Sequence, residues 1–162
     1  MVQIIYKPIG IIHTPFKEQG NTPIQGVYAP DSKGAVEVFP QYVEGLQDLN
    51  GFSHLILIYH FHHARDYSLI KKPFLDDSAR GIFSIRHFNR PNPIGMSVVR
   101  LDEINGNELI IGEIDIIDGT PLLDIKPYIP DFDTRHNVRK GWYECASNRH
   151  VYEQGKGVRK VQ

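Results

Sequence analysis

The sequence is poor in the features that mark secreted and membrane proteins. Only one of its 162 residues is a cysteine, Cys145, so the chain cannot form an internal disulfide. No apolar run approaches the roughly 18 residues of a membrane-spanning helix. Lys7 and Pro8 interrupt the apolar N-terminus where a signal peptide would have its core. We therefore expect a protein of the reducing cytoplasm without membrane association.

Several common site signatures are also missing. The sequence has no internal repeat, no Gly-x-Ser-x-Gly nucleophile motif, no phosphate-binding glycine loop and no dinucleotide fingerprint. What is present is an ordinary globular composition, with 41% hydrophobic and 23% charged residues. A chain of this length is expected to form one domain with a single core.

The net charge of −1 hides an uneven distribution. Residues 135–162 carry seven Lys or Arg against two Glu, a local charge of +5, which leaves −6 for the rest of the chain. The basic residues are Arg135, Arg139, Lys140, Arg149, Lys156, Arg159 and Lys160. Such a cluster is suited to phosphate contacts, although a solvated chain end would look the same. We predict a folded domain over residues 1–134 and a basic C-terminal extension over 135–162, packed on it or trailing from it.

Hydrophobic residues alternate along most of the chain, which favours strands. Residues 55–61 are rich in strand formers and predict a central strand buried on both faces. Residues 98–104 and 108–117 flank Asn105-Gly106 and predict a tight antiparallel hairpin. Further strands are expected at residues 4–13, 35–39 and 81–86, and a helix only at 41–49.

The fold class that follows is mainly β, a single-sheeted antiparallel β-barrel with short helical and loop insertions. Turn-forming residues gather between 20 and 34, and charges gather between 71 and 80. We interpret both segments as long loops that carry recognition.

A proline-rich segment at residues 86–95 is the first candidate site. Pro91 and Pro93 restrict the backbone around Asn92 and predict a rigid, extended platform. Such a platform can hold Arg86 and Arg90 near a ligand. The alternative is a proline-stiffened start of a strand with surface arginines.

A second candidate segment spans residues 115–128 and turns at Asp118-Gly119. The Asp118 carboxylate can cap this turn, or it can receive an amine or ribose hydroxyls of a ligand. Asp124 and Lys126 are expected to form a polar pair beside the site. Spacing alone does not decide between these readings.

The histidines raise a metal hypothesis. His60 and His62 point to one face of an extended strand, and Asp66 follows. The metal-binding run of cupin barrels, however, has a glycine before its first histidine and a later matching motif, and both are absent here. We expect no metal, and keep a metal-dependent barrel enzyme as an alternative.

Four stretches in series carry a family resemblance. They are Ile-Gly-Ile-Ile-His-Thr-Pro-Phe at 9–16, Phe-Ser-His-Leu at 52–55, Arg-Pro-Asn-Pro-Ile-Gly-Met-Ser at 90–97, and Asp-Gly-Thr-Pro with Asp-Ile-Lys-Pro-Tyr between 118 and 128. Together they resemble the TsaA-like family, the TrmO-type tRNA methyltransferases, over about residues 4–130. This chain looks like a short form, without the extra C-terminal domain of the bacterial relatives.

The resemblance implies a single-sheeted β-barrel that binds S-adenosylmethionine beside a homodimer interface. It also implies methyl transfer to the exocyclic nitrogen of threonylcarbamoyl-adenosine beside the tRNA anticodon. Matching positions give the implied cofactor contacts as Gln25, Gly26, His62, His63, Arg86, Val98, Asp118, Gly119, Thr120 and Pro121.

The proton acceptor is not identified by the sequence. Candidate catalytic residues are Asp118, His62, Arg90 and Asn92. The main alternative is a non-catalytic S-adenosylmethionine sensor or RNA-binding module, which would bind the cofactor but transfer no methyl group.

Overall fold

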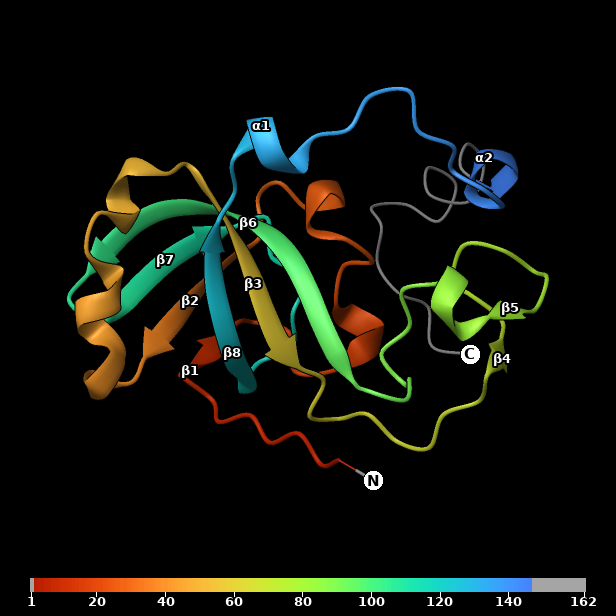
Figure 1. The fold of residues 1–162 in the computed structure, drawn as a ribbon, viewed down its shortest axis with the longest axis horizontal. Coiled ribbons are helices and arrows are strands. Elements are labelled where there is room, and N and C mark those ends of the chain that lie inside the picture. Colours follow the sequence, from red (N-terminus) through yellow and green to blue (C-terminus); the bar gives the residue numbers. More distant parts are fainter. Residues whose placement is uncertain (1, 147–162) are drawn as a thin grey trace.

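Six strands close into an antiparallel barrel, which confirms the predicted fold class. The computed structural model describes residues 2–146, and Figure 1 shows the barrel in the order β1-β2-β7-β6-β3-β8. The strands are β1 (Gly10–His13), β2 (Lys33–Val38), β3 (His54–His60), β6 (Ile94–Asn105), β7 (Glu108–Gly112) and β8 (Thr120–Pro127). A separate ribbon pairs β4 (Ile70–Lys71) with β5 (Arg80–Gly81). Within the described residues, no helix has both the length and the apolar character needed to cross a membrane.

Alternating side chains from every barrel strand fill the interior. The fully buried core includes Ile12, Val36, Val38, Leu55, Leu57, Val99, Leu109, Ile111 and Leu122. The odd-numbered face of β3 therefore points inward, as its apolar pattern predicts. Its even-numbered face, with Ile56 and Ile58, is only partly buried. The prediction of a strand buried on both faces is wrong, because no second layer formed by residues 2–146 covers the barrel there.

The predicted hairpin is confirmed, but its turn lies one residue later. Asn105 pairs with Glu108, so Gly106 and Asn107 form the two-residue turn. Only Gly106 has a positive φ, 62°, and a glycine at the first turn position is the pattern of a type II′ turn. Strand β7 ends at Gly112 instead of residue 117, because Glu113 adopts a φ of 58° and redirects the chain.

Other predicted elements are shorter or different. The strand expected at 4–13 is reduced to β1, and the one expected at 35–39 begins two residues earlier. Only Gly81 of the strand expected at 81–86 lies in a strand, and a 3-10 turn (Ile82–Ser84) follows. The helix expected at 41–49 consists of 3-10 turns, Pro40–Leu46 and Leu49–Gly51, separated at Asp48 by a φ of 64°.

Strand β8 was not predicted, since the segment at residues 115–128 was interpreted only through its turn at Asp118-Gly119. It closes the barrel by pairing with both β1 and β3. Pro121 lies opposite Ile11 of β1, and the pairing with β3 shifts register near Tyr59. A ladder irregularity of this kind is a common way to accommodate such residues.

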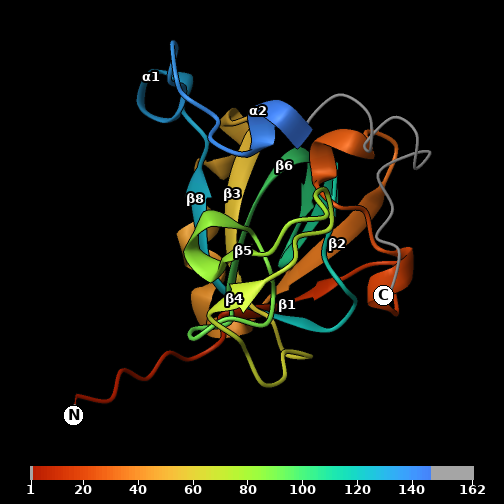
Figure 2. The same ribbon diagram turned by 90° about the vertical axis from the view of Figure 1, so that its right-hand side faces the viewer.

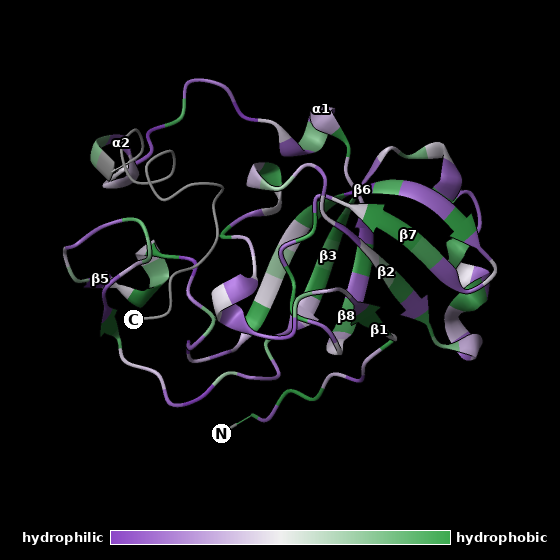
Figure 3. Ribbon diagram, turned by 180° about the vertical axis from the view of Figure 1, so that it is seen from behind, coloured by the Kyte–Doolittle hydropathy of each residue, from purple (hydrophilic) through white to green (hydrophobic). Residues whose placement is uncertain are grey.

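The antiparallel order places three long connections at the same end of the barrel. Residues 14–32, 61–93 and 113–119 join β1 to β2, β3 to β6 and β7 to β8. At the other end are residues 39–53, the β6–β7 turn and α1 (Pro130–Asp133). From α1 the chain returns to α2 (Tyr143–Ala146), which lies on the side of β4 and β5 (Figures 1 and 2). Figure 3 shows that the barrel strands hold much of the hydrophobic sequence, whereas the segment between α1 and α2 is mainly hydrophilic.

Candidate functional site

A cleft of about 420 Å³ opens at the end of the barrel that carries the three long connections. Gln25, Arg86, Arg90 and Asn92 all line it. The Arg86 guanidinium donates a hydrogen bond to Gln25 Oε1 at 3.0 Å. The structure thus brings together predicted residues from two connections that are 61 positions apart in sequence.

The platform that carries the arginines is a run of bends, not the extended segment predicted. Arg90 donates to the carbonyl of Ile85 at 3.3 Å, and Asn89 Oδ1 accepts the backbone N–H of Arg65 at 2.8 Å. The prolines prevent a helix here, but tertiary hydrogen bonds determine the path. The side-chain oxygen of Asn89 is therefore already bonded to the backbone of the 61–93 connection.

A buried polar chain forms the floor of the cleft. The Ser97 hydroxyl donates to Asp115 Oδ1 at 2.6 Å, and the Tyr59 hydroxyl lies 2.9 Å from Ser97 Oγ. Since Ser97 has one proton and gives it to Asp115, Tyr59 is the donor to Ser97. A Cβ on Gly95 would lie 2.2 Å from the Tyr59 ring, so only glycine leaves room for this ring.

Sequence reasoning missed Asp115, Ser97 and Tyr59. Asp115 is only 5% exposed, and it was visible as a single charge within an otherwise apolar run at residues 114–117. A buried carboxylate needs hydrogen-bond donors to be stable. Ser97 of β6 donates to Asp115, and Tyr59 of β3 donates in turn to Ser97.

A smaller hollow continues from the cleft and shares Tyr59, Phe61 and Asp115 with it. His62, His63 and Thr120 line this hollow. Two groups of predicted cofactor contacts are therefore adjacent: Gln25 and Arg86 line the cleft, and His62, His63 and Thr120 line the hollow.

The tautomer of His62 follows from its partner. Thr120 Oγ1 donates to the carbonyl of Ile117 at 2.7 Å and lies 3.3 Å from His62 Nδ1. Because the threonine proton is already used, His62 Nδ1 is the donor, and Nε2 is the basic nitrogen. Burial, together with the nearby charges of His63 and His60, lowers the pKa of His62. The ring is neutral at neutral pH.

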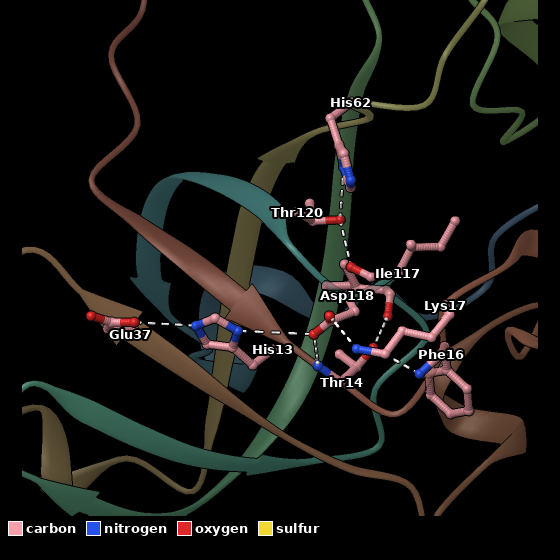
Figure 4. Close-up of polar contacts among 10 residues, drawn as sticks. His13, Thr14, Phe16, Lys17, Glu37, His62, Ile117, Asp118 and Thr120 are labelled. Atoms are coloured by element: carbon pink, nitrogen blue, oxygen red, sulfur yellow. Dashed lines mark hydrogen bonds and ion pairs between the residues drawn. The ribbon is translucent and has the colours of Figure 1, made fainter.

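Asp118 occupies a different position (Figure 4). Its Oδ1 accepts the backbone N–H of Thr14 at 2.9 Å, and its Oδ2 forms an ion pair with Lys17. Of the two readings that the sequence left open, capping of its own turn is not observed, because the hydrogen-bond partners of this carboxylate are Thr14 and Lys17. The hydrogen bond from Lys17 and that from Thr14 hold the pKa of Asp118 below its usual range.

The remaining predicted contacts do not line the cleft. Gly26 is buried, and a Cβ there would lie 1.8 Å from the carbonyl oxygen of Glu113. Pro121 is half-buried on β8. Val98 is 39% exposed on the outer face of β6. Its side chain points away from the barrel interior.

Other polar residues lie outside this arrangement. Asp124 and Lys126 form the predicted pair, at 2.7 Å, on exposed parts of β8. Among residues 2–146, no three His, Cys, Asp or Glu side chains come together in a group able to hold a metal ion.

The chain has clear relatives. Residues 11–134 match the family of the tRNA-methyltransferase O N-terminal domain. A probable S-adenosyl-L-methionine-binding protein of Pyrococcus abyssi is 55% identical over 96% of this chain and 83% of its own length. The tRNA (adenine(37)-N6)-methyltransferase of Mus musculus is 32% identical over 83% of this chain and 33% of its own length.

A solved structure agrees with the sequence relatives. The crystal structure of TrmO from Pseudomonas aeruginosa matches with a TM-score of 0.74 and 37% identity, over 87% of this chain and 63% of that one. This chain thus spans less than two thirds of that bacterial protein. Barrel, motifs and identity agree, and the chain belongs to the tRNA-methyltransferase O N-terminal domain family.

Proposed function

We propose that this chain is an S-adenosylmethionine-dependent tRNA methyltransferase that acts on the exocyclic nitrogen of threonylcarbamoyl-adenosine beside the anticodon. Family membership and the names of its relatives support the reaction class. The observation that carries the proposal is the convergence of Gln25, Arg86, Arg90 and Asn92 in one cleft. Arg90 and Asn92 belong to the motif at residues 90–97 that resembles the family, and Gln25 and Arg86 are matching positions outside the four motif stretches.

The cleft suits the cofactor in size and chemistry. Its volume of about 420 Å³ lies within the range of small-molecule sites. Arg86 and Arg90 are suited to the carboxylate of the amino-acid part, and Phe61 and Phe83 offer flat apolar surfaces to a base. We assign Gln25, His62, His63 and Thr120 as further contacts.

S-adenosylmethionine supplies an activated methyl group when it is bound. The protein then has to orient the acceptor nitrogen and exclude water. That nitrogen belongs to a urea and is weakly basic, so a carboxylate, a histidine or water has to take its proton during or after the transfer. His62 is the better candidate, because its ring is neutral and its basic Nε2 faces away from Thr120, whereas the pKa of Asp118 is lowered by Lys17.

This assignment gives a pH test. The methyl-transfer rate should fall as the pH drops through the lowered pKa of His62, and His62→Gln should remove that acid limb. An unchanged acid limb in the variant would exclude His62 as the proton acceptor. Cofactor affinity, measured by calorimetry across the same pH range, separates proton transfer from binding.

The decisive experiment is mass spectrometry of tRNA nucleosides after incubation with protein and cofactor, with and without the threonylcarbamoyl group. We expect one added methyl only on the modified nucleoside. Cofactor binding without methyl transfer would support a non-catalytic sensor. In parallel, Arg86→Ala and Asp118→Ala should weaken cofactor binding, and Asp124→Ala on the outer face of β8 is the control.

We further propose that the chain acts as a homodimer. Ile94, Met96 and Val98 form an exposed apolar stripe on β6, with exposed fractions of 42%, 54% and 39%. Ile56 and Ile58 flank this stripe on β3. Large exposed apolar stripes commonly mark protein interfaces. Val98 points outward and does not line the cleft of its own subunit, so we propose that it contacts the cofactor in the cleft of a partner subunit.

Light scattering tests the dimer. Met96→Lys should shift the protein towards monomer, since it places a charge in the stripe. Phe132→Lys, at a 66% exposed position on α1, is the matched control. A monomeric wild-type protein would rule out this interface.

The basic extension is our candidate tRNA contact. Arg139 and Lys140 are exposed, while Arg135 donates to the carbonyls of Phe132 and Thr134. Arg149, Lys156, Arg159 and Lys160 lie outside the described residues. Truncation after Ala146 should weaken tRNA binding and flatten its salt dependence. We keep the division into 1–134 and 135–162, and a cytoplasmic location, as parts of the proposal.

A further inference from the structure

A second cavity lies beside the cofactor cleft. It has a volume of about 470 Å³ and shares Gln25 and Arg86 with the cleft. The 3.0 Å hydrogen bond between these two side chains therefore separates the two spaces. A ligand in this cavity would be an immediate neighbour of one in the cleft.

Several aromatic side chains line this cavity beside aliphatic ones. We call it the aromatic pocket and define it by Tyr28, Phe74, His87, Lys140, Trp142 and Tyr143. Phe74 and His87 are stacked, with centroids 5.5 Å apart and an interplanar angle of 5°. The Tyr28 and Tyr143 hydroxyls lie 2.7 Å apart. These contacts hold flat apolar surfaces in fixed positions.

Trp142 is also held in place. Its Nε1 donates to the carbonyl of Ser84 at 2.8 Å, and the Arg80 guanidinium lies 5.7 Å from the ring centroid. Arg80 is itself paired with Asp76. The ring is thus preorganised before any ligand binds, which lowers the entropy cost of binding.

The wall formed by residues 140–143 lies beyond the part of the chain that matches the family, residues 11–134. None of the described residues that line the cofactor cleft lies in this wall. The aromatic pocket therefore combines residues of the shared domain, such as Tyr28, Phe74 and His87, with a wall from the segment that follows it.

We propose that the aromatic pocket binds an unpaired nucleobase of the RNA substrate, next to the nucleotide that enters the cleft. This inference rests on the proposed function. Proteins bind single-stranded RNA by stacking splayed bases on aromatic rings and contacting the phosphates with cations. Lys140 supplies the cation, and no acidic side chain is found among the described residues that line the pocket.

Trp142 provides the direct test, because it is the only tryptophan in the sequence. Titration of the full chain with an anticodon stem-loop RNA should quench the fluorescence of Trp142. The dissociation constant obtained from the quenching should equal the one that calorimetry gives for the same RNA. S-adenosylmethionine alone should leave the fluorescence unchanged. Equal quenching by the cofactor alone would overturn the inference, since the pocket would then belong to the cofactor.

Two other outcomes separate this inference from the proposed function. RNA that binds and is methylated without any change in Trp142 fluorescence overturns the pocket assignment and leaves the methyltransferase intact. RNA that neither binds nor is methylated overturns both. The two failures are distinguishable from one set of titrations.

Substitutions give a second readout. Trp142→Leu should weaken RNA binding at least about fivefold, as loss of one stacked base does, while Trp142→Phe retains most of the affinity. Lys140→Ala should reduce the salt slope by about one. Phe132→Leu and Lys126→Ala, which lie outside the pocket, are the controls. Unchanged RNA affinity in Trp142→Leu, with cofactor affinity and circular dichroism as in the wild type, overturns the proposal.

Discussion

Ser97→Ala should destabilise the barrel more than any ordinary serine substitution. The change removes the hydroxyl that donates to Asp115 at 2.6 Å and accepts from Tyr59 at 2.9 Å. A hydrogen bond to a charged group contributes about 1.5–3 kcal/mol and a neutral one about 0.5–1.5 kcal/mol. We therefore expect a loss of about 2–4 kcal/mol in the free energy of unfolding, because all three residues are buried.

Urea denaturation followed by far-ultraviolet circular dichroism measures this loss. Ser68→Ala is the control, since its exposed hydroxyl donates to the carbonyl of Ile70 at 2.8 Å and should change stability by no more than about 0.5 kcal/mol. Tyr59→Phe combined with Ser97→Ala should cost less than the sum of the single changes, as expected for partners in one network. A Ser97→Ala protein as stable as the Ser68→Ala control would refute the reasoning.

Three further predictions concern backbone and charge. Gly26→Ala should weaken cofactor binding in calorimetry, because its Cβ would lie 1.8 Å from the Glu113 carbonyl oxygen and force the loop away from the cleft. Gly106→Ala should cost about 1 kcal/mol in thermal unfolding, and this cost comes from the φ of 62°, since no atom lies within 4 Å of the added Cβ. Lys17→Met should raise the pKa of Asp118 towards its usual range, which carboxyl NMR titration would detect. The lowered pKa of this carboxyl gives stability that is present above the ordinary carboxyl pKa and lost as the pH falls through the folded value. The Lys17→Met variant should therefore lose less stability on acidification than the wild type.

The local elements of the fold were largely readable from the sequence. The strand at residues 55–61 was predicted correctly from its composition, although only the face with Leu55 and Leu57 is fully buried and burial on both faces was expected. The hairpin between β6 and β7 followed from a glycine between two apolar runs. Even there the turn moved from Asn105-Gly106 to Gly106-Asn107, since cross-strand pairing sets the register.

Strand β8 could not be predicted from its local sequence. The sequence predicted only the turn at Asp118-Gly119 before it, yet pairing with β1 and β3 on either side makes these residues a strand and closes the barrel. Residues 82–84 have the composition of a strand but find no barrel partner and form a 3-10 turn. Strand formation depends on partners that are remote in sequence, and propensity does not report them.

The candidate site, like the fold, was only partly predictable from the sequence. By itself, the sequence determined the chemistry that is available: the arginines and asparagine of the proline-rich segment, the histidine pair and the family motifs. Only the tertiary structure decided which groups meet. In the folded chain Gln25 forms a hydrogen bond with Arg86, and Asp115 lines both the cleft and the smaller hollow. Asp118 pairs with Lys17, and Val98 points outward. The reason is physical, since a side chain's partners, burial and pKa depend on which distant segments the closed barrel brings to the same end.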